Sequence, residues 1–366
     1  MNSARRAAVC WGMNRLFCFA LFASMAACSG SEATPLPQAE MQCASAAALG
    51  VGDAGPGSRD ILPAPVVTLS DADCRKFTVV PEAIPVLLFH SICAGPCDPA
   101  NIYGVPQTEF VRIMLMLEGA GYATISIADY VQAMKSEAVS LPPQPILLTF
   151  DDGRFDAYVG ADDVLRAAHA RATMFVITSA AEAKNPAFMQ WSEIVTAQDS
   201  GRWDIQLHAD AGHVKIPAGV AADGTPLMRA SYANRLYDAK AYAAASGHLE
   251  AASAWQARVD GDVLRGIALL RHNVAAYVPL AFAVPFGDYG QLTSNDPVIA
   301  PHLQTLFDAQ FGAWFTQLHG HPDFTTPGPT HEHARFTVFT STTAETIYAW
   351  LSSTAKQRAA LALPTK

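Results

Sequence analysis

The chain has 366 residues, of which 51% are hydrophobic and 16% are charged, and its formal net charge is −9 at pH 7. This length and apolar content allow a globular domain with a sizeable buried core. Outside the first 27 residues no stretch is rich in Lys and Arg. Nucleic-acid binders need such a basic footprint, so nucleic acid is excluded as an expected partner.

Residues 1–27 have the pattern of an export signal. Three arginines precede an apolar run, residues 16–27, that is too short to span a bilayer. The run ends in Met25-Ala-Ala-Cys28, which is similar to the bacterial lipobox, where the cysteine becomes lipid-modified. We therefore expect a lipoprotein signal peptide and a lipid anchor on Cys28. Ser29 carries no inner-membrane retention signal, so the outer membrane is favoured over a soluble periplasmic or secreted location.

Residues 28–79 are rich in Ala, Gly, Pro and Ser, which predicts a flexible tether. Four cysteines remain after Cys28, and an even number in an oxidising compartment predicts two disulfides. The simplest pairing joins Cys43 to Cys74 and Cys93 to Cys97.

From about residue 80, apolar strands alternate with helical patterns. Phe110, Ile113, Met114 and Leu117 follow the spacing of one buried helix face. Alternating strands and helices predict parallel βαβ units. The expected fold class is therefore α/β, a distorted parallel (β/α) barrel that follows the N-terminal tether.

Residues 146–153 run from an apolar strand directly into Asp151, Asp152 and Gly153. Loops at the C-terminal ends of barrel strands carry the chemistry of such folds. The two carboxylates alternate in direction, so one can hold a metal while the other handles protons. The alternative is a structural turn, because Asp and Gly both favour turns.

A second short strand, residues 203–208, ends in His208, and His213 follows. Two imidazoles and one carboxylate, with positions left open, suit a catalytic divalent ion such as zinc. His208 and Asp152 both follow predicted strands, so both are expected at one barrel rim. The spacing of the two histidines is weak evidence by itself, and a lone histidine is more often structural.

The chain resembles the polysaccharide deacetylases, the nodulation-B homology domain of carbohydrate esterases. Five stretches carry the resemblance in order within residues 84–350, namely residues 85–90, 110–130, 149–177, 191–208 and 281–289. The resemblance implies a catalytic domain over residues 80–356, followed by a short tail at residues 357–366.

The resemblance also implies the roles of the site residues. It makes Asp152, His208 and His213 the ligands of a divalent metal, with Zn²⁺ as the expected ion, and Asp151 the general base. The expected reaction is removal of N-acetyl groups from a polysaccharide by metal-activated water. A backbone N–H after Asp152 is a further candidate for stabilising the oxyanion.

Two departures from the general family pattern are similar to the branch that acts on poly-N-acetylglucosamine. The two histidines enclose four residues, and no arginine precedes Pro285. That arginine usually orients the base, and Arg335 resembles a late family arginine that could replace it. The general acid is expected to be a histidine after a leucine, as in Leu318-His319, and three further histidines of the same stretch are alternatives: His321, His331 and His333.

Four residues are expected to contact the substrate, namely His90, Pro285, Phe286 and Tyr289. An insertion at about residues 214–271 follows His213, with a Gly/Pro loop over residues 216–226 and helical stretches over residues 232–271. Its position favours a substrate-binding wall or lid over packing decoration.

Two other functions remain open, an O-acetyl esterase acting on xylan-type glycans and a non-catalytic glycan-binding lipoprotein. A glycosidase is disfavoured because two adjacent carboxylates cannot easily flank a glycosidic bond. The expected partners are an N-acetylated polysaccharide, a membrane reached through Cys28, and proteins of exopolysaccharide synthesis or export.

Overall fold

A computed structural model describes residues 84–135, 139–238, 248–317 and 331–352. These residues all belong to one compact unit, Cys43–Lys366. Several expectations fall outside the described residues, namely the signal peptide, the Cys28 anchor, the tether, the Cys43–Cys74 disulfide, His319, His321 and the C-terminal tail.

Seven parallel strands form a closed ring, in the order β1, β14, β13, β12, β7, β6 and β5. The ring closes because β1 pairs with both β14 and β5. An eighth strand, β4 (Ala123–Thr124), pairs with the start of β5. The predicted distorted α/β barrel is therefore confirmed. The ring strands are β1 (Val86–Phe89), β5 (Pro145–Phe150), β6 (Ala172–Ile177), β7 (Trp203–Ala209), β12 (Ala281–Ala283), β13 (Ala313–Gln317) and β14 (Glu332–Thr337).

The barrel interior is a packed apolar core rather than a channel. Phe175 and Phe315 fill it, and small residues of β12 and β13 leave room for their rings. The helix α2 (Ile127–Met134) adds Tyr130 to this core. The first backbone N–H of α2 donates to Asp204 near the start of β7, so α2 closes the N-terminal end of the barrel. The opposite end stays available for a site.

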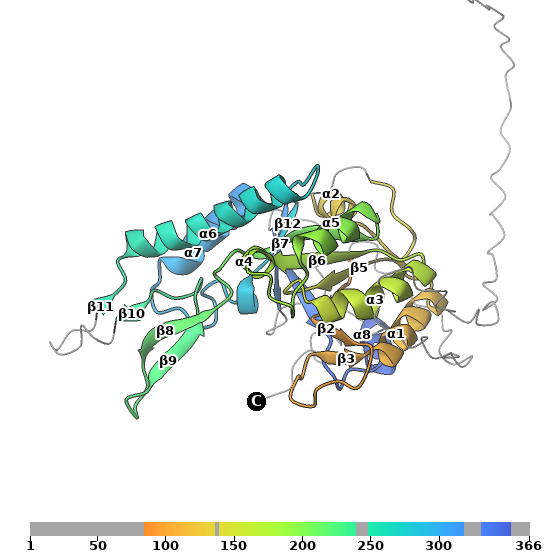
Figure 1. The fold of residues 1–366 in the computed structure, drawn as a ribbon, viewed down its shortest axis with the longest axis horizontal. Helices are drawn as coiled ribbons and strands as arrows, with labels where there is room; N and C mark the ends of the chain where they lie inside the picture. Colours follow the sequence, from red (N-terminus) through yellow and green to blue (C-terminus); the bar gives the residue numbers. More distant parts are fainter. Residues whose placement is uncertain (1–83, 136–138, 239–247, 318–330, 353–366) are drawn as a thin grey trace, which may run out of the picture. The chain divides into compact units, whose positions relative to one another are not determined.

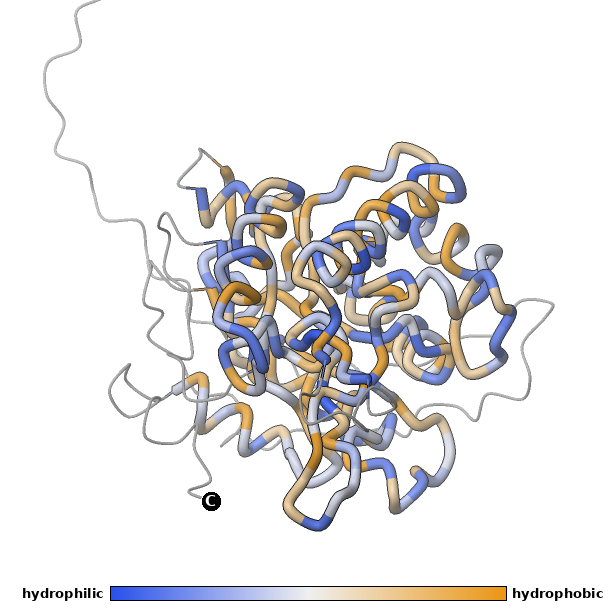
Figure 2. Tube along the Cα trace, turned by 90° about the vertical axis from the view of Figure 1, so that its left-hand side faces the viewer, coloured by the Kyte–Doolittle hydropathy of each residue, from blue (hydrophilic) through white to orange (hydrophobic). Residues whose placement is uncertain are grey.

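Helices cover the outside of the ring and bury one face each. The positions Phe110, Ile113, Met114 and Leu117 of α1 are all buried, as their spacing predicts. Hydrophilic and hydrophobic stretches alternate along the chain, as expected for helices with one buried face (Figure 2). The covering helices are α1 (Gln107–Gly119), α3 (Phe155–Ala167), α5 (Trp191–Asp199), α6 (Ala252–Asn273), α7 (Ile299–Gln310) and α8 (Ala344–Ser352).

Short elements complete the barrel rim. The strands β2 (Ser91–Cys93) and β3 (Gly104–Pro106) pair with each other, and the predicted disulfide between Cys93 and Cys97 is present. Two short helical segments, α4 (Thr178–Glu182) and η3 (Pro285–Gly287), follow β6 and β12. Within the described ranges, no helix has both the length and the apolar character needed to cross a bilayer.

The insertion differs from its predicted secondary structure in two places. Most of the predicted loop over residues 216–226 is a β-hairpin of β8 (Lys215–Val220) and β9 (Pro226–Ala230). Its turn contains Gly224 at φ 84° and Asp223, which accepts hydrogen bonds from Thr225. The turn residues therefore connect two strands, a common use of Asp and Gly.

The predicted helix over residues 232–271 begins at Ala252 instead. The segment before it contains two short paired strands, β10 (Tyr237–Asp238) and β11 (His248–Leu249). The Asn295 side chain bonds both the N–H and the carbonyl of Arg235, and these tertiary contacts override the local helical preference. The helices α6 and α7 then run side by side (Figure 1), where Asp260 pairs with His302.

Candidate metal centre and active site

The chain turns sharply after β5 and separates two neighbouring carboxylates. Asp152 and Gly153 both adopt left-handed conformations, with φ 72° and 68°. A Cβ at Gly153 would lie 3.0 Å from the Val176 side chain, so both the conformation and the space favour glycine. Asp151 consequently faces the barrel interior, whereas Asp152 faces the rim.

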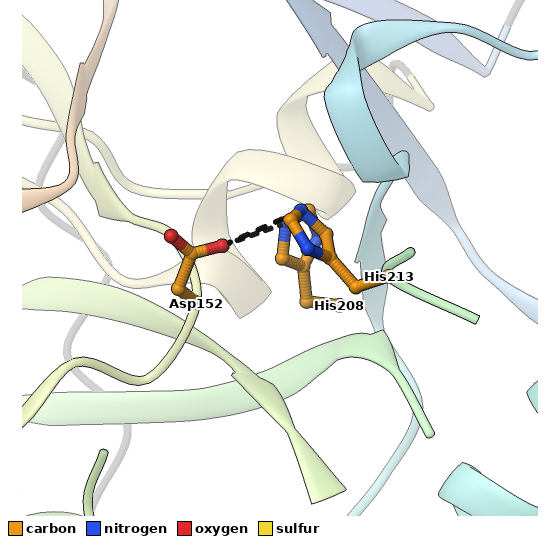
Figure 3. Close-up of side chains that lie close together, drawn as sticks. All are labelled: Asp152, His208 and His213. Carbon is orange, nitrogen blue, oxygen red and sulfur yellow. Dashed lines mark ion pairs between the residues drawn. The ribbon is translucent and has the colours of Figure 1, made fainter. Parts of the chain in front are cut away.

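Asp152, His208 and His213 converge at the C-terminal rim of the barrel, as Figure 3 shows. Asp152 Oδ1 lies 3.4 Å from His208 Nε2 and 3.5 Å from His213 Nε2. Within the described part of the chain, this buried oxygen has no hydrogen-bond donor. An unsatisfied buried carboxylate oxygen facing two imidazole nitrogens fits a bound cation.

The histidine orientations also suit metal ligands. His208 Nδ1 donates to the Ala283 carbonyl at 2.7 Å, which leaves Nε2 as the acceptor that faces Asp152. Burial lowers the pKa of His213 to about 4, and the neighbouring His208 adds to this effect. His213 is therefore neutral at neutral pH, the protonation state that a metal ligand requires.

Two carboxylates make the centre favourable for positive charge. Burial by itself would lower the pKa of His208, but the Asp151 and Asp152 carboxylates outweigh burial and raise it. The two carboxylates therefore stabilise positive charge on the His208 ring, next to the position that a cation would occupy.

Asp151 is fully enclosed by an ion pair with Arg335. Two guanidinium nitrogens donate to its two carboxylate oxygens, both at 2.7 Å, and the side chains are 1% and 0% exposed. The guanidinium lies over the neighbouring rings of Phe175 and Phe315, 5.6 and 5.7 Å from their centres. Burial would raise the pKa of Asp151, but Arg335 and His208 outweigh it and lower the pKa. The carboxylate is therefore ionised, as a proton acceptor must be.

The pocket above the centre contains two of the four predicted substrate contacts. His90 and Phe286 line it, and His90 packs on Tyr103 with ring centres 4.4 Å apart. The Phe286 ring stacks on His213 at 4.3 Å.

The other two predicted contacts, Pro285 and Tyr289, are not part of the described pocket wall. Tyr289 is 6% exposed, donates its hydroxyl to Glu332, and packs against Trp314. The chain turns at η3, which contains Phe286 and ends at Gly287, two residues before Tyr289. The Tyr289 ring therefore faces the core, whereas the Phe286 ring faces the rim.

The pocket also contains residues that the sequence patterns did not indicate, namely Asn101, Tyr103, Arg154 and Gln317. Arg154 directly follows the Asp-Asp-Gly turn, and Gln317 is the last residue of β13. Both residues lie near the C-terminal end of a barrel strand, and that position in the sequence would have indicated the pocket. Asn101 and Tyr103 reach the pocket from the loop between β2 and β3, whose folding over the rim has no local sequence signal.

The described histidines near β14 lie away from the pocket. His333 is 1% exposed inside the barrel, and its Nδ1 is 2.9 Å from the Tyr130 hydroxyl. His331 precedes β14, at the N-terminal end of the barrel, and pairs with Asp308 of α7 at 3.3 Å. Neither residue lines the described pocket.

The buried, neutral His333 is expected to make the fold less stable at mildly acidic pH, because this side chain takes up a proton when the chain unfolds. Burial lowers its pKa from 6.5 to about 3, and His331 adds to this effect. The unfolded chain binds more protons between these values, so the free energy of unfolding falls as pH decreases below 6.5. The expected slope for one proton is about 1.4 kcal/mol per pH unit.

Urea denaturation of the metal-free wild type and of His333→Asn, between about pH 5 and pH 7, measures this contribution. The variant is expected to show the shallower pH dependence. Equal slopes for the two proteins would contradict the assignment of a neutral buried histidine.

Sequence and structure comparisons agree with this geometry. Residues 138–297 match the family profile described as polysaccharide deacetylase. Over 100 residues the chain is 34% identical to YxkH of Bacillus subtilis (strain 168), which is named provisionally as a polysaccharide deacetylase. That alignment covers 27% of this chain and 34% of YxkH, so the chain spans about a third of the length of this relative.

Two solved structures share the fold. One is a de-N-acetylase from Aggregatibacter actinomycetemcomitans, with a TM-score of 0.58 and 18% identity, covering 73% of this chain and 99% of that chain. The other is the BpsB deacetylase domain from Bordetella bronchiseptica, with a TM-score of 0.55 and 21% identity, covering 70% of this chain and 96% of that chain. Residues 138–297 thus match a polysaccharide deacetylase profile, and the barrel has the same fold as these two solved structures.

Proposed function

We propose that the protein is a metal-dependent hydrolase that removes N-acetyl groups from a polysaccharide similar to poly-N-acetylglucosamine. One observation carries the proposal. Asp152, His208 and His213 converge beside an ionised, Arg335-bound Asp151, at the floor of an open pocket on the barrel rim.

Each residue of the centre has a distinct proposed task. Asp152, His208 and His213 would hold a divalent ion, most consistent with Zn²⁺ because of the two imidazoles and one carboxylate. Such an ion supplies Lewis-acid chemistry and lowers the pKa of water. Asp151 would accept the proton from the attacking water. Arg335 occupies two of the lone-pair positions of the Asp151 carboxylate, fixes its orientation and leaves the others for that proton.

His319 is the proposed general acid. Gln317, the last described residue of β13, lines the pocket. His319 follows it by two residues in the sequence and lies outside the described residues. His331 and His333 are poorer candidates because one lies at the opposite end of the barrel and the other is neutral and enclosed. A protonated His319 would donate its proton to the amine that leaves.

We also propose that the protein is exported and anchored to the outer membrane through Cys28. The support is the N-terminal sequence pattern, together with the Cys93–Cys97 disulfide, because disulfides persist mainly in oxidising compartments. A lipid anchor would place the pocket near nascent envelope polysaccharide and near the proteins that make or export it.

Acetate release by purified residues 29–366 tests the proposed activity. The expected result is release from N-acetylglucosamine oligomers that is lost with chelator and restored with Zn²⁺. His208→Ala should abolish both release and metal binding, since it removes a buried ligand.

An acetylated xylan provides the matched substrate control, because the same water attack also cleaves esters. Release from xylan alone would replace the proposed de-N-acetylase with an O-acetyl esterase. Bound metal without release from either polymer would favour a glycan-binding role instead.

A further inference from the structure

The loop that contains His213 is held by contacts from the insertion, in addition to the bonds that Thr178 and Ser179 of α4 donate to Asp210. His208 lies within β7 and Asp152 lies in the turn after β5, so strand pairing positions both residues. His213 follows the end of β7 by four residues, and a loop this long needs its own supports. Its position therefore depends on what the backbone of residues 210–214 contacts.

Asp262 of α6 supplies the main contact. Its two carboxylate oxygens accept hydrogen bonds from two consecutive backbone N–H groups, those of Asp210 at 2.9 Å and Ala211 at 2.8 Å. These residues precede His213 by only three and two positions. Charge-assisted bonds of this kind are stronger than bonds between neutral groups, so one carboxylate fixes the start of the loop.

Tyr232 supports the middle of the same loop. A Cβ at Gly212 would lie 2.2 Å from the Tyr232 ring and 3.0 Å from Asp262 Oδ2. Gly212 is therefore packed directly against both side chains. The Tyr232 hydroxyl also donates to Asp262 Oδ2, and the ring is fully buried. On the far side of His213, the Ser231 N–H donates to the Val214 carbonyl at 3.0 Å.

The helix α6, which contains Asp262, packs closely against the barrel. Gly266, one turn after Asp262, packs so closely that a Cβ would lie 2.6 Å from Leu207 of β7. Arg265 donates to the Asp210 carboxylate at 2.7 Å, and Thr178 donates to its other oxygen at 2.7 Å. The helix α6 and the loop are thus joined by several independent contacts along one helix face.

We propose that Asp262 is a positioning residue for the metal ligand His213, and that Tyr232 keeps Asp262 and Gly212 in place. The insertion then acts as a structural support of the metal centre in addition to any contact with substrate. This inference rests on the proposed metal site.

Metal affinity of the Asp262→Asn variant is the test. Asparagine keeps the size of the side chain, but its NH₂ group faces one of the two backbone donors and cannot accept from it. We expect Zn²⁺ affinity to fall by about 10- to 100-fold, the usual effect of losing an outer partner of a ligand. Co²⁺ titrations give a second readout, because visible absorption reports how many ligands bind.

Three further variants separate positioning from general stability. Asp260→Asn lies on the same helix but removes the pair with His302 of α7, and it should keep wild-type affinity. Tyr232→Phe keeps the ring against Gly212 and should weaken binding less than Asp262→Asn. Asp262→Glu retains the carboxylate and should recover part of the affinity.

The outcomes are distinct for the two proposals. Wild-type affinity in Asp262→Asn, with metal binding lost in His213→Ala, would overturn the positioning role and leave the metal site intact. Failure of the wild-type protein to bind Zn²⁺ or Co²⁺ would overturn both. Equal losses in Asp262→Asn and Asp260→Asn would show a general effect of α6 and would also overturn the positioning role.

Discussion

Asp151→Asn is expected to slow acetate release by about 10²- to 10⁴-fold, the usual contribution of a general base. Asparagine has the shape of aspartate but cannot accept a proton at neutral pH. The proposed ligands Asp152, His208 and His213 are unchanged, so Zn²⁺ affinity should remain within a few-fold of wild type. Steady-state kinetics and a Zn²⁺ titration on the same preparation measure both quantities.

The comparison with His208→Ala makes this result specific. His208→Ala should lose metal and activity together, whereas Asp151→Asn should lose activity alone. If Asp151→Asn also lost the metal, Asp151 would be a ligand, in line with its 4.0 Å distance from His208 Nε2. If it kept more than about a tenth of the wild-type rate, another group would be the base.

Arg335→Met is expected to destabilise the fold by about 3–5 kcal/mol, the usual cost of removing one partner of a buried ion pair. The loss leaves the Asp151 charge enclosed, since that side chain is 1% exposed. Methionine fills similar space over the rings of Phe175 and Phe315 but donates no hydrogen bond. Urea denaturation of the metal-free protein measures the change.

Arg202→Met is the matched control for this prediction. Arg202 forms the same two-bonded pair with Asp162, at 3.1 and 2.8 Å, but the two side chains are 26% and 20% exposed. Its loss should cost only about 0–1 kcal/mol. Equal costs for the two variants would mean that burial does not make the Arg335 pair important.

A double variant identifies the cause of the instability. Asp151→Asn together with Arg335→Met removes both charges, so it should be more stable than Arg335→Met alone. A double variant that is as unstable as the single one would point to lost packing around Phe175 and Phe315 rather than to an uncompensated carboxylate.

Much of the metal centre was predictable from the sequence because parallel strands share one rim. Asp152 comes directly after an apolar strand and Asp151, and His208 lies at the end of a short strand, and in a parallel barrel such positions meet at the same end. The short spacing from His208 then limits how far away His213 can lie. The Cys93–Cys97 disulfide is the simplest pairing that the sequence offers for these two cysteines, because they are only four positions apart.

The residues that line the pocket were harder to predict, because aromatic residues serve cores and pockets equally. Phe286 lines the pocket, whereas Tyr289, three residues later, packs against Trp314 in the core. The turn between Phe286 and Tyr289 makes their two side chains point in different directions, and the type of residue does not predict which direction each one takes.

The sequence by itself determined the strand and helix alternation and the three residues of the candidate metal centre, because apolar periodicity and residues near strand ends are local properties. Only the tertiary structure decided which distant side chains support that centre. Arg335 reaches Asp151 across 184 residues once β1 closes the ring, and Asp262 reaches the His213 loop across 52 residues once α6 packs on β7. Such pairings follow from barrel closure and helix packing, and no local pattern of the chain specifies them.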